Sequence, residues 1–589
     1  MNTHTNFSGA GLKLGLALSG GGFRASFFHI GVLAQLAMLG LLRPIEVIST
    51  VSGGSIIGAL YYLHVKKLLE SKADAAISDG DYKELIENIE RDFFEAVKSN
   101  FRVRTFADLK KNLLTGRAGY SHTDRIAELL DEDLYRPVLQ SSSPILMREL
   151  KIQPPSAKPD FFPRTDNAGR QAKVPILVIN ATSLNTGRNW QFTAAWMGEP
   201  PHEDPISLDI DKKPKRLRRP DSYLELPHQQ DFPLAHAVAA SACVPGIFNP
   251  LAISDTYPDI RVQLVDGGVH DNQGILSLLD EVCTHFIISD ASGQLGEDDD
   301  PDTEIAAVLR RADGIFSDRL REEELFRVFD TKSGSRVAFL HLRKGLPTTG
   351  IAWLNAIGEP AEPEKVVRPA SPPSAPEDFA VAEPVQDLLS KVRTDLDSFS
   401  EVEAHSLMLD AYRMTAAVIP TVPQIGSLGT APIPQDQARW KFVDIASYMQ
   451  QPTEYYLQQL EAASEKFLKV FRLIRPKWLG ETLRLTVLLA PVVLLLYLAW
   501  LLRKCDFSLG ALLFLAIIGA VVYFSRSLTE RFSWLRRLRS YRQMLVRLLG
   551  RALLSVLICP LLWLHLRFIN PLFLKLGSVD KLSSKGYGK

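Results

Sequence analysis

Residues 14–25 read Leu14-Gly15-Leu16-Ala17-Leu18-Ser19-Gly20-Gly21-Gly22-Phe23-Arg24-Ala25. The first five residues are suited to a buried strand, and the apolar pattern from Ala25 to Leu39 is typical of a helix. Between them, consecutive glycines let backbone N–H groups converge on one point, and the following helix N-terminus adds partial positive charge. The stretch therefore predicts an anion-binding turn between a strand and a helix of an α/β fold.

Other uses of such a turn are a dinucleotide pyrophosphate site or a simple chain reversal. A P-loop is excluded because the Gly-Lys-Ser/Thr ending is missing. A dinucleotide site would place an acidic residue at the end of the second strand, where this chain has Ile48-Ser49-Thr50-Val51-Ser52. The sequence therefore disfavours the dinucleotide interpretation.

A second strand-to-helix turn is Thr50-Val51-Ser52-Gly53-Gly54-Ser55. It is similar to a nucleophile elbow, in which a sharp turn lifts a serine hydroxyl above the sheet and neighbouring glycines make room for the strained backbone. Thr50 stands where that pattern has its first glycine. The turn makes Ser52 a candidate nucleophile, with Thr50 and Gly54 as elbow residues.

A third motif, Val265-Asp266-Gly267-Gly268, follows another apolar strand. An aspartate there can act as general base on a serine hydroxyl if the two strand ends are neighbours. An Asp-Gly turn with a solvated carboxylate is the alternative for this motif taken alone.

Short apolar runs alternate with helical patterns over the first 345 residues, which predicts a mostly parallel sheet covered by helices. The expected strands are 14–18, 46–50, 176–180, 262–265, 286–289 and 337–342, and the expected helices include 25–39, 55–67 and 399–417. Seven prolines between Gly358 and Gln386 indicate a linker or insertion.

The composition is that of a folded chain with more than one structural unit: 589 residues, 46% hydrophobic and 23% charged. Its four cysteines are too scattered for a disulfide framework or a zinc site. Residues 466–589 carry 21 Lys and Arg against four Asp and Glu, whereas the first 465 residues carry 46 against 63. An acidic body with a basic, apolar tail argues for a membrane surface as partner and against nucleic acid.

Two uncharged runs, Leu485–Leu502 and Phe507–Ser525, are each about as long as a bilayer crossing, and they predict a pair of transmembrane helices. Basic flanks on both sides place both ends and the large N-terminal part in the cytoplasm. A shorter run, 552–566, is either a third crossing or an interfacial helix. The Arg-rich stretch 526–551 is expected to contact anionic lipid headgroups. We therefore expect a multi-pass membrane protein, with a bacterial inner membrane as the expected location.

The three motifs, in this order, resemble the patatin-like phospholipase family. The resemblance extends to Arg24 and the helix through His29, to the strand end at Asn180, to the stretch Ala239–Phe248 and to Asp395-Leu396-Asp397-Ser398-Phe399. It covers residues 12–345, with the helix near 390–417 as a continuation. It implies a three-layer α/β fold with a mostly parallel central sheet, to which the C-terminal transmembrane helices are added.

The resemblance implies a Ser-Asp dyad, with Ser52 as nucleophile and Asp266 as its base. Backbone N–H groups of Gly20, Gly21 and Gly22 would hold the oxyanion, Arg24 would fix that loop, and Gly267 and Gly268 would complete the Asp-Gly-Gly motif. An acyl-serine intermediate would then be cleared by water, without a metal or a cofactor. The implied domains are a catalytic domain at 1–345, a Pro-rich linker at 346–386, a helical continuation at 387–465 and a membrane-anchoring region at 466–589.

The expected function is therefore a membrane-anchored lipid acyl hydrolase of the phospholipase or lysophospholipase type. Membrane lipids would serve as both substrate and anchor. An acyltransferase or acyl thioesterase on the same dyad, and a catalytically inactive membrane scaffold, are the alternatives. Within the site, His270 or His285 could replace Asp266 as base, and Cys243 offers a thiol, although apolar neighbours would raise its pKa.

Overall fold

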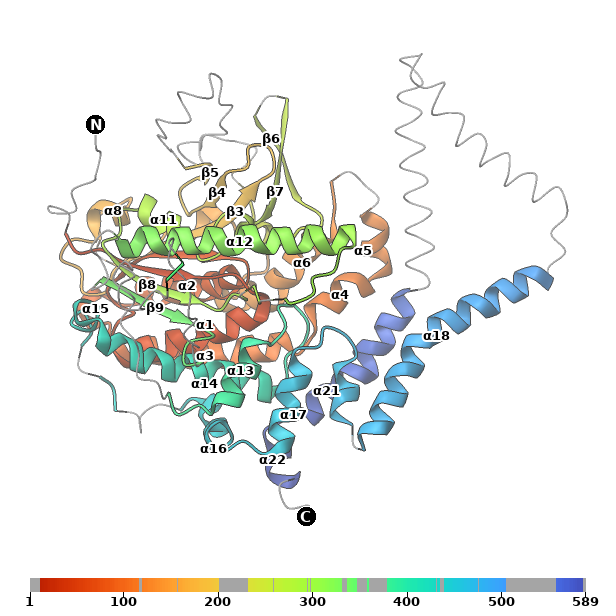
Figure 1. The fold of residues 1–589 in the computed structure, drawn as a ribbon. Coiled ribbons are helices and arrows are strands. Elements are labelled where there is room, and N and C mark those ends of the chain that lie inside the picture. The colour runs from red at the N-terminus through yellow and green to blue at the C-terminus, as the bar shows by residue number, and fades with distance from the viewer. Residues whose placement is uncertain are drawn as a thin grey trace. The chain divides into compact units, whose positions relative to one another are not determined.

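The computed structural model describes residues 11–115, 119–155, 157–200, 231–257, 259–293, 295–296, 298–330, 336–346, 358–359, 379–430, 432–434, 439–474, 476–504 and 558–585. Two compact units divide the chain (Figure 1). The first is drawn from residues 1–102, 122–464 and 577–589, and the second from 103–121 and 465–576. The three motifs and the residues that surround them all belong to the first unit.

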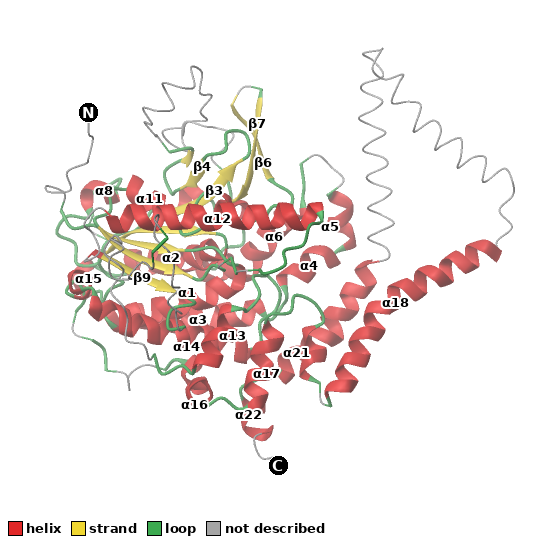
Figure 2. Cartoon of the chain, viewed as in Figure 1, coloured by secondary structure: helices red, strands yellow, loops and turns green. Residues whose placement is uncertain are grey.

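Within the described residues, the first unit is built on one nine-stranded sheet (Figure 2). Strands β3, β2, β1, β8 and β9 are mutually parallel neighbours in that order. Strands β4 and β7 both pair antiparallel with β3, and β5 and β6 extend them. The strands are β1 Leu14–Leu18, β2 Ile45–Val51, β3 Ile176–Ser183, β4 Asn189–Phe192, β5 Met197–Gly198, β6 Leu251–Tyr257, β7 Ile260–Asp266, β8 His285–Asp290 and β9 Val337–His341.

All six expected strands are confirmed, with ends shifted by at most a few residues. Strands β4, β5 and β6 were not expected. The four residues of β4 alternate between polar (Asn189, Gln191) and apolar side chains, yet all four are buried. A run of only four residues is too short to mark a strand by its pattern alone.

Helices cover both faces of the sheet, as the two apolar clusters show. Leu16 and Leu18 of β1 point into the larger cluster, with α1 (Gly22–Met38), α2 (Gly53–Ser71), α3 (Asp79–Val97) and α14 (Glu401–Val418). Ala17 points into a second cluster, with α11 (Ile275–Asp280) and α12 (Ile305–Asp330). Because side chains alternate across a strand, these clusters lie on opposite faces, which gives a three-layer α/β fold with a mostly parallel sheet.

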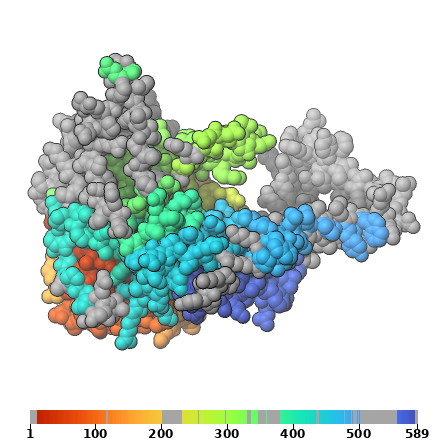
Figure 3. Space-filling view, turned by 60° about the horizontal axis from the view of Figure 1, so that its bottom comes forward, coloured from red at the N-terminus to blue at the C-terminus, as the bar shows by residue number. Residues whose placement is uncertain are grey.

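The helices after the first two motifs begin earlier than expected, at Gly22 and Gly53 instead of Ala25 and Ser55. The glycines are therefore the first helical residues, whose N–H groups have no partner inside the helix. The expected helix at 399–417 is confirmed as α14, and it packs along α1. Figure 3 shows residues from this later part of the chain, in blue-green shades, lying over the red N-terminal segments of the unit.

The expected linker at 346–386 is only partly covered by the structure, because residues 347–357 and 360–378 lie outside the described ranges. Its end is corrected, since α13 (Glu383–Ser390) already begins inside it. Pro384 stands in the first turn of α13, where a missing N–H costs no helical hydrogen bond. A proline-rich composition therefore does not mark the end of the linker.

The second unit is described by α5 (Leu109–Leu114), α18 (Lys477–Lys504) and α21 (Asn570–Leu576). Glu465 accepts from Arg472 and Arg484, at 3.1 Å each. The expected crossing 485–502 falls within α18, whereas 507–525, 526–551 and the first part of 552–566 lie outside the described residues. Over the part of the chain that the structure describes, no helix is long and apolar enough to cross a membrane, so the expected transmembrane helices are not found there.

Candidate active site

The register of the sheet brings the second and third motifs to one point along β3. The last residue of β2, Val51, pairs with Asn180 of β3, and the last residue of β7, Asp266, pairs with the next residue, Ala181. Ala181 also pairs with β4, which takes up one edge of β3, so β7 lies along the other edge. That is the edge along which β2 pairs with residues 176–180 of β3. The carboxyl ends of β2 and β7 therefore meet head to head, which brings Ser52 and Asp266 together.

Ser52 has the backbone conformation of a nucleophile elbow. It stands between β2 and α2 with φ 50° and ψ −117°, and it is only 4% exposed. A residue with a Cβ pays about 1–3 kcal/mol to hold such a conformation. The turn is also tight, because a Cβ on Gly53 would lie 2.7 Å from the carbonyl carbon of Gly22 and 2.8 Å from its nitrogen. The second motif therefore touches the glycine loop directly.

A chain of hydroxyl groups supports the strained turn. The Ser52 N–H donates to Ser241 Oγ at 2.9 Å, and Ser241 Oγ lies 2.8 Å from Ser55 Oγ. Ser55 donates to Thr50 Oγ1 at 2.9 Å, and Thr50 donates to the carbonyl of Val178 at 3.2 Å. Since Ser55 uses its proton on Thr50, Ser241 must donate to Ser55, so every hydroxyl in the chain both donates and accepts. Thr50 thus replaces the usual glycine as an anchor of the elbow to β3.

We expect Ser241→Ala to lower kcat about tenfold, because the buried Ser52 N–H would lose its acceptor and a buried unpaired N–H costs about 1–3 kcal/mol. A matched control is Ser406→Ala in α14, whose hydroxyl is also buried and lies 2.8 Å from Tyr456 Oη. Both variants should lower Tm, but only Ser241→Ala should lower kcat per folded molecule. Equal kcat in the two variants would contradict a role for Ser241 in holding the elbow.

Asp266 is a buried carboxylate with one oxygen occupied and one open. Its Oδ1 accepts the Gly268 N–H at 2.8 Å, whereas no hydrogen bond of normal geometry reaches Oδ2 from the described residues. Burial raises the pKa of Asp266 from 3.8 to about 6, against smaller lowering effects of the Gly268 N–H and the Ser52 hydroxyl. The residue is therefore a carboxylate at neutral pH, with a proton affinity suited to a general base.

The glycine loop supplies backbone donors next to Ser52, but not all those expected. The Gly20 N–H donates to the carbonyl of Asn272 at 2.9 Å and is not available for an oxyanion. The N–H groups of Gly21, Gly22 and Gly53 have no hydrogen-bond partner among the described residues. Gly53, whose N–H follows the candidate nucleophile, was missed as a donor, although the elbow pattern itself points to that N–H.

Arg24 lies beneath the loop and does not offer its guanidinium to a ligand. Its Nε and Nη2 donate to the carbonyl of Ala291 at 3.1 and 2.8 Å, and Nη1 donates to that of Val392 at 2.8 Å. The side chain is buried, and burial lowers its pKa to about 10. Arg24 therefore ties α1 to the ends of two other segments, which agrees with a role in fixing the loop.

Asn272 is a residue of the site to which sequence reasoning gave no role. Its backbone carbonyl binds Gly20, and its Oδ1 lies where a Cβ on Gly20 would be and 2.6 Å from a Cβ placed on Gly268. The side chain thus fills the space between the glycine loop and the Asp-Gly-Gly motif. Gly267 packs against the strands instead, because a Cβ there would lie 2.9 Å from the carbonyl carbon of Asn180 in β3 and 3.2 Å from Cγ1 of Val51 in β2.

The other candidate bases, His285 and His270, and the other candidate nucleophile, Cys243, have different surroundings. His285 pairs with Leu14 at the amino end of the parallel strands, the end opposite Ser52. His270 follows the turn at Gly267–Val269, and its N–H donates to the Gly267 carbonyl at 3.0 Å. The thiol of Cys243 is buried beside the carbonyls of Ala240 and Leu264, and burial raises its pKa well above the ordinary value. Cys243 is therefore a packed thiol, as its apolar neighbours predict.

The described residues contain no group of three or more His, Cys, Asp and Glu side chains arranged to hold a metal ion. The chemistry available at the site is that of a serine hydroxyl, a buried carboxylate and backbone N–H groups.

Comparisons with known proteins give one family match and several similar solved structures. The model of the patatin-like phospholipase family matches residues 16–279, which include all three motifs. No curated protein matches the chain. Similar solved structures include human GIVD cytosolic phospholipase A2 with methyl gamma-linolenyl fluorophosphonate, and the same protein with that inhibitor and terbium chloride.

These two structures are each 14% identical to the chain and cover 71% of it, with TM-scores of 0.34 and 0.36. The chain spans 59% and 60% of their lengths. The likeness to a patatin-like phospholipase domain therefore extends over residues 16–279, which hold the elbow, the glycine loop and the Asp-Gly-Gly turn.

Proposed function

We propose that this chain is a lipid acyl hydrolase of the phospholipase or lysophospholipase type that works through Ser52 and Asp266. The observation that carries the proposal is the meeting of β2 and β7 on one edge of β3, which joins a strained serine to a buried carboxylate. The glycine loop adds the N–H groups of Gly21 and Gly22, and the elbow adds that of Gly53; none of the three has a hydrogen-bond partner among the described residues. These three parts are the ones that acyl transfer needs.

In the proposed reaction Asp266 takes the proton of the Ser52 hydroxyl as Oγ attacks the ester carbonyl. The carbonyl oxygen becomes an oxyanion and accepts from the loop N–H groups, each of which is typically worth about 3–4 kcal/mol to the transition state. Collapse of this intermediate expels the alcohol, which takes the proton from Asp266, and leaves an acyl-serine. Water, deprotonated by Asp266, then releases the fatty acid and restores Ser52.

The second part of the proposal is that residues 466–589 bring the domain to membrane lipids. Support comes from the excess of 21 basic over four acidic residues and from the apolar runs between them. Anionic headgroups at 526–551, a cytoplasmic catalytic domain and a bacterial inner membrane remain the proposed setting. A lipid with two acyl chains is scarce in free solution, so holding the site at a bilayer supplies proximity.

The test is incubation of the full chain with vesicles of mixed zwitterionic and anionic phospholipid, with free fatty acid and lipid-bound protein both measured. We expect release of fatty acid, and sedimentation of the protein with the vesicles that survives high salt. Transfer of the acyl group to added glycerol, without free fatty acid, would favour the acyltransferase alternative. Neither product would favour the inactive scaffold, and protein left in the supernatant would contradict the anchor.

A further inference from the structure

The segment between α13 and α14 forms the outer wall of the glycine loop. The carbonyl of Asp395 accepts the Phe23 N–H at 2.9 Å, and that of Val392 accepts from Arg24. Gly22 has φ 57°, and a Cβ on it would lie 2.6 Å from the carbonyl oxygen of Asp395 and 2.8 Å from its nitrogen. The position of Asp395 therefore fixes the position of the first turn of α1.

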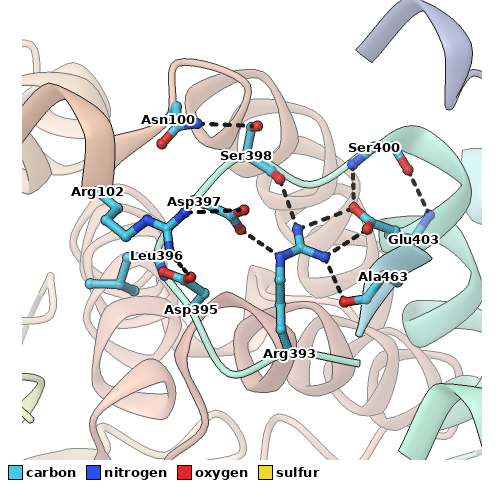
Figure 4. Close-up of polar contacts among 10 residues, drawn as sticks. All are labelled: Asn100, Arg102, Arg393, Asp395, Leu396, Asp397, Ser398, Ser400, Glu403 and Ala463. Carbon is cyan, nitrogen blue, oxygen red and sulfur yellow. Dashed lines mark hydrogen bonds and ion pairs between the residues drawn. The ribbon is translucent and has the colours of Figure 1, made fainter. Parts of the chain in front are cut away.

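Arg102 restrains Asp395 as well, as Figure 4 shows. Its Nη1 forms an ion pair with Asp395 Oδ2, and its backbone N–H donates to the Leu396 carbonyl at 2.9 Å. The other carboxylate oxygen of Asp395 accepts the Leu396 N–H at 2.7 Å. Both oxygens of the side chain thus restrain the same short stretch of backbone.

A second arginine anchors the segment to the body of the unit (Figure 4). The side chain of Arg393 is completely buried; it donates to Asp397 Oδ1 at 2.8 Å and to Glu403 Oε1 at 2.7 Å. It also donates to the carbonyls of Ser398 and Ala463, at 2.9 Å each. Glu403 in turn accepts the Ser400 N–H at 2.8 Å in the capping box of α14. The wall is therefore rigid behind Asp395.

We propose that the Arg102–Asp395 ion pair positions the glycine loop for oxyanion binding. This inference rests on the proposed function. By holding the Asp395 carbonyl on the Phe23 N–H, the pair sets the direction of the neighbouring Gly21 and Gly22 N–H groups before substrate arrives. Donors that are oriented in advance stabilise developing charge without reorganisation during the reaction. Asp395 touches no reacting atom in this scheme, so it is a positioning residue.

The test is Asp395→Asn in the full chain, compared with Asp387→Asn. The control removes the same charge from the ion pair between Asp387 and Lys391, which lie 2.6 Å apart and have side chains 44% and 57% exposed. Exposed ion pairs of this kind contribute little to stability. We expect Asp395→Asn to lower kcat about tenfold with KM changed less than about threefold, since mispositioned donors weaken transition-state binding. The Phe23 amide, which donates to the Asp395 carbonyl, should also exchange hydrogen faster than in the control.

Arg102→Gln removes the pair from its other side and serves as the second variant if Asp395→Asn does not fold. Arg102 Nη2 also lies 3.9 Å from Asp397 Oδ2, and Arg102→Gln removes that contact as well. The double variant should therefore be no slower than Arg102→Gln alone, because Asp395→Asn then has no ion pair left to remove. Unchanged kcat, or a loss of kcat with unchanged exchange at the Phe23 amide, would overturn the inference. If the wild type released no fatty acid, the proposed function would fail, and the exchange measurement alone would still decide whether the pair positions the loop.

Discussion

Replacing Ser52 with alanine is expected to reduce kcat/KM for fatty-acid release by about 10⁴-fold or more, to the level of the background reaction. The hydroxyl is the only part of the residue that reacts, and alanine keeps the Cβ and the N–H that donates to Ser241. Tm should therefore stay close to that of the wild type. The measurement is the initial rate of release from phospholipid vesicles at equal concentrations of folded protein.

Ser52→Gly gives the same prediction a structural control. Glycine adopts φ 50° without a Cβ penalty, so this variant should be as inactive as Ser52→Ala and more stable by roughly 1–2 kcal/mol. A long-chain fluorophosphonate should label the wild type at Ser52 and label neither variant. Ser317→Ala, at an exposed serine of α12, should label like the wild type. Labelling of Ser52→Ala would place the nucleophile elsewhere.

The sequence was sufficient to predict the two helix-forming turns, because each combines a buried strand, glycines and an apolar helix in fixed order. It was also sufficient for the six expected strands, which are short and mainly apolar. It could not show that β7 pairs with the same edge of β3 as β2, because that pairing joins residues about 80 positions apart in the sequence. The Ser52–Asp266 pairing was therefore conditional until the register was known.

The partners of the site residues were harder to predict than the residues themselves. A free Gly20 N–H is a reasonable expectation for a glycine loop, but the carbonyl of Asn272, which is 252 residues away in sequence, occupies it. Ser241 is the last residue of the apolar helix α10 (Leu234–Ser241), and nothing local marks it as the acceptor for the Ser52 N–H. Asp395 was recognised only by resemblance, because its contact with the glycine loop is made by its backbone.

Replacing Asp266 with asparagine is expected to lower kcat about 10²–10⁴-fold, the usual contribution of a general base. Asparagine keeps the shape of the side chain and an acceptor for the Gly268 N–H, but it cannot accept the Ser52 proton. His270→Ala is the matched control, because His270 is the alternative base in the same turn. Activity that is lost in His270→Ala and kept in Asp266→Asn would reverse the assignment.

The pH profile gives an independent check on Asp266. Its pKa of about 6 predicts that kcat/KM falls tenfold per pH unit below pH 6 and is constant above it until another group titrates. The residual activity of Asp266→Asn should lack this acidic limb. An unchanged limb in the variant would assign the titration to another group.

Ionisation of Asp266 should lower the stability of the folded protein while it raises the activity. A carboxyl whose pKa is raised on folding destabilises the folded state when ionised; this cost is absent below about pH 4 and is complete above about pH 6. A shift of about two units corresponds to roughly 3 kcal/mol. Asp266→Asn should therefore unfold at the same or a higher temperature than the wild type at pH 7.5, and the difference should vanish near pH 4. This result is expected if Asp266 is a catalytic carboxylate whose burial destabilises the folded state. If the carboxylate instead stabilised the fold, Asp266→Asn would have a lower Tm than the wild type at neutral pH.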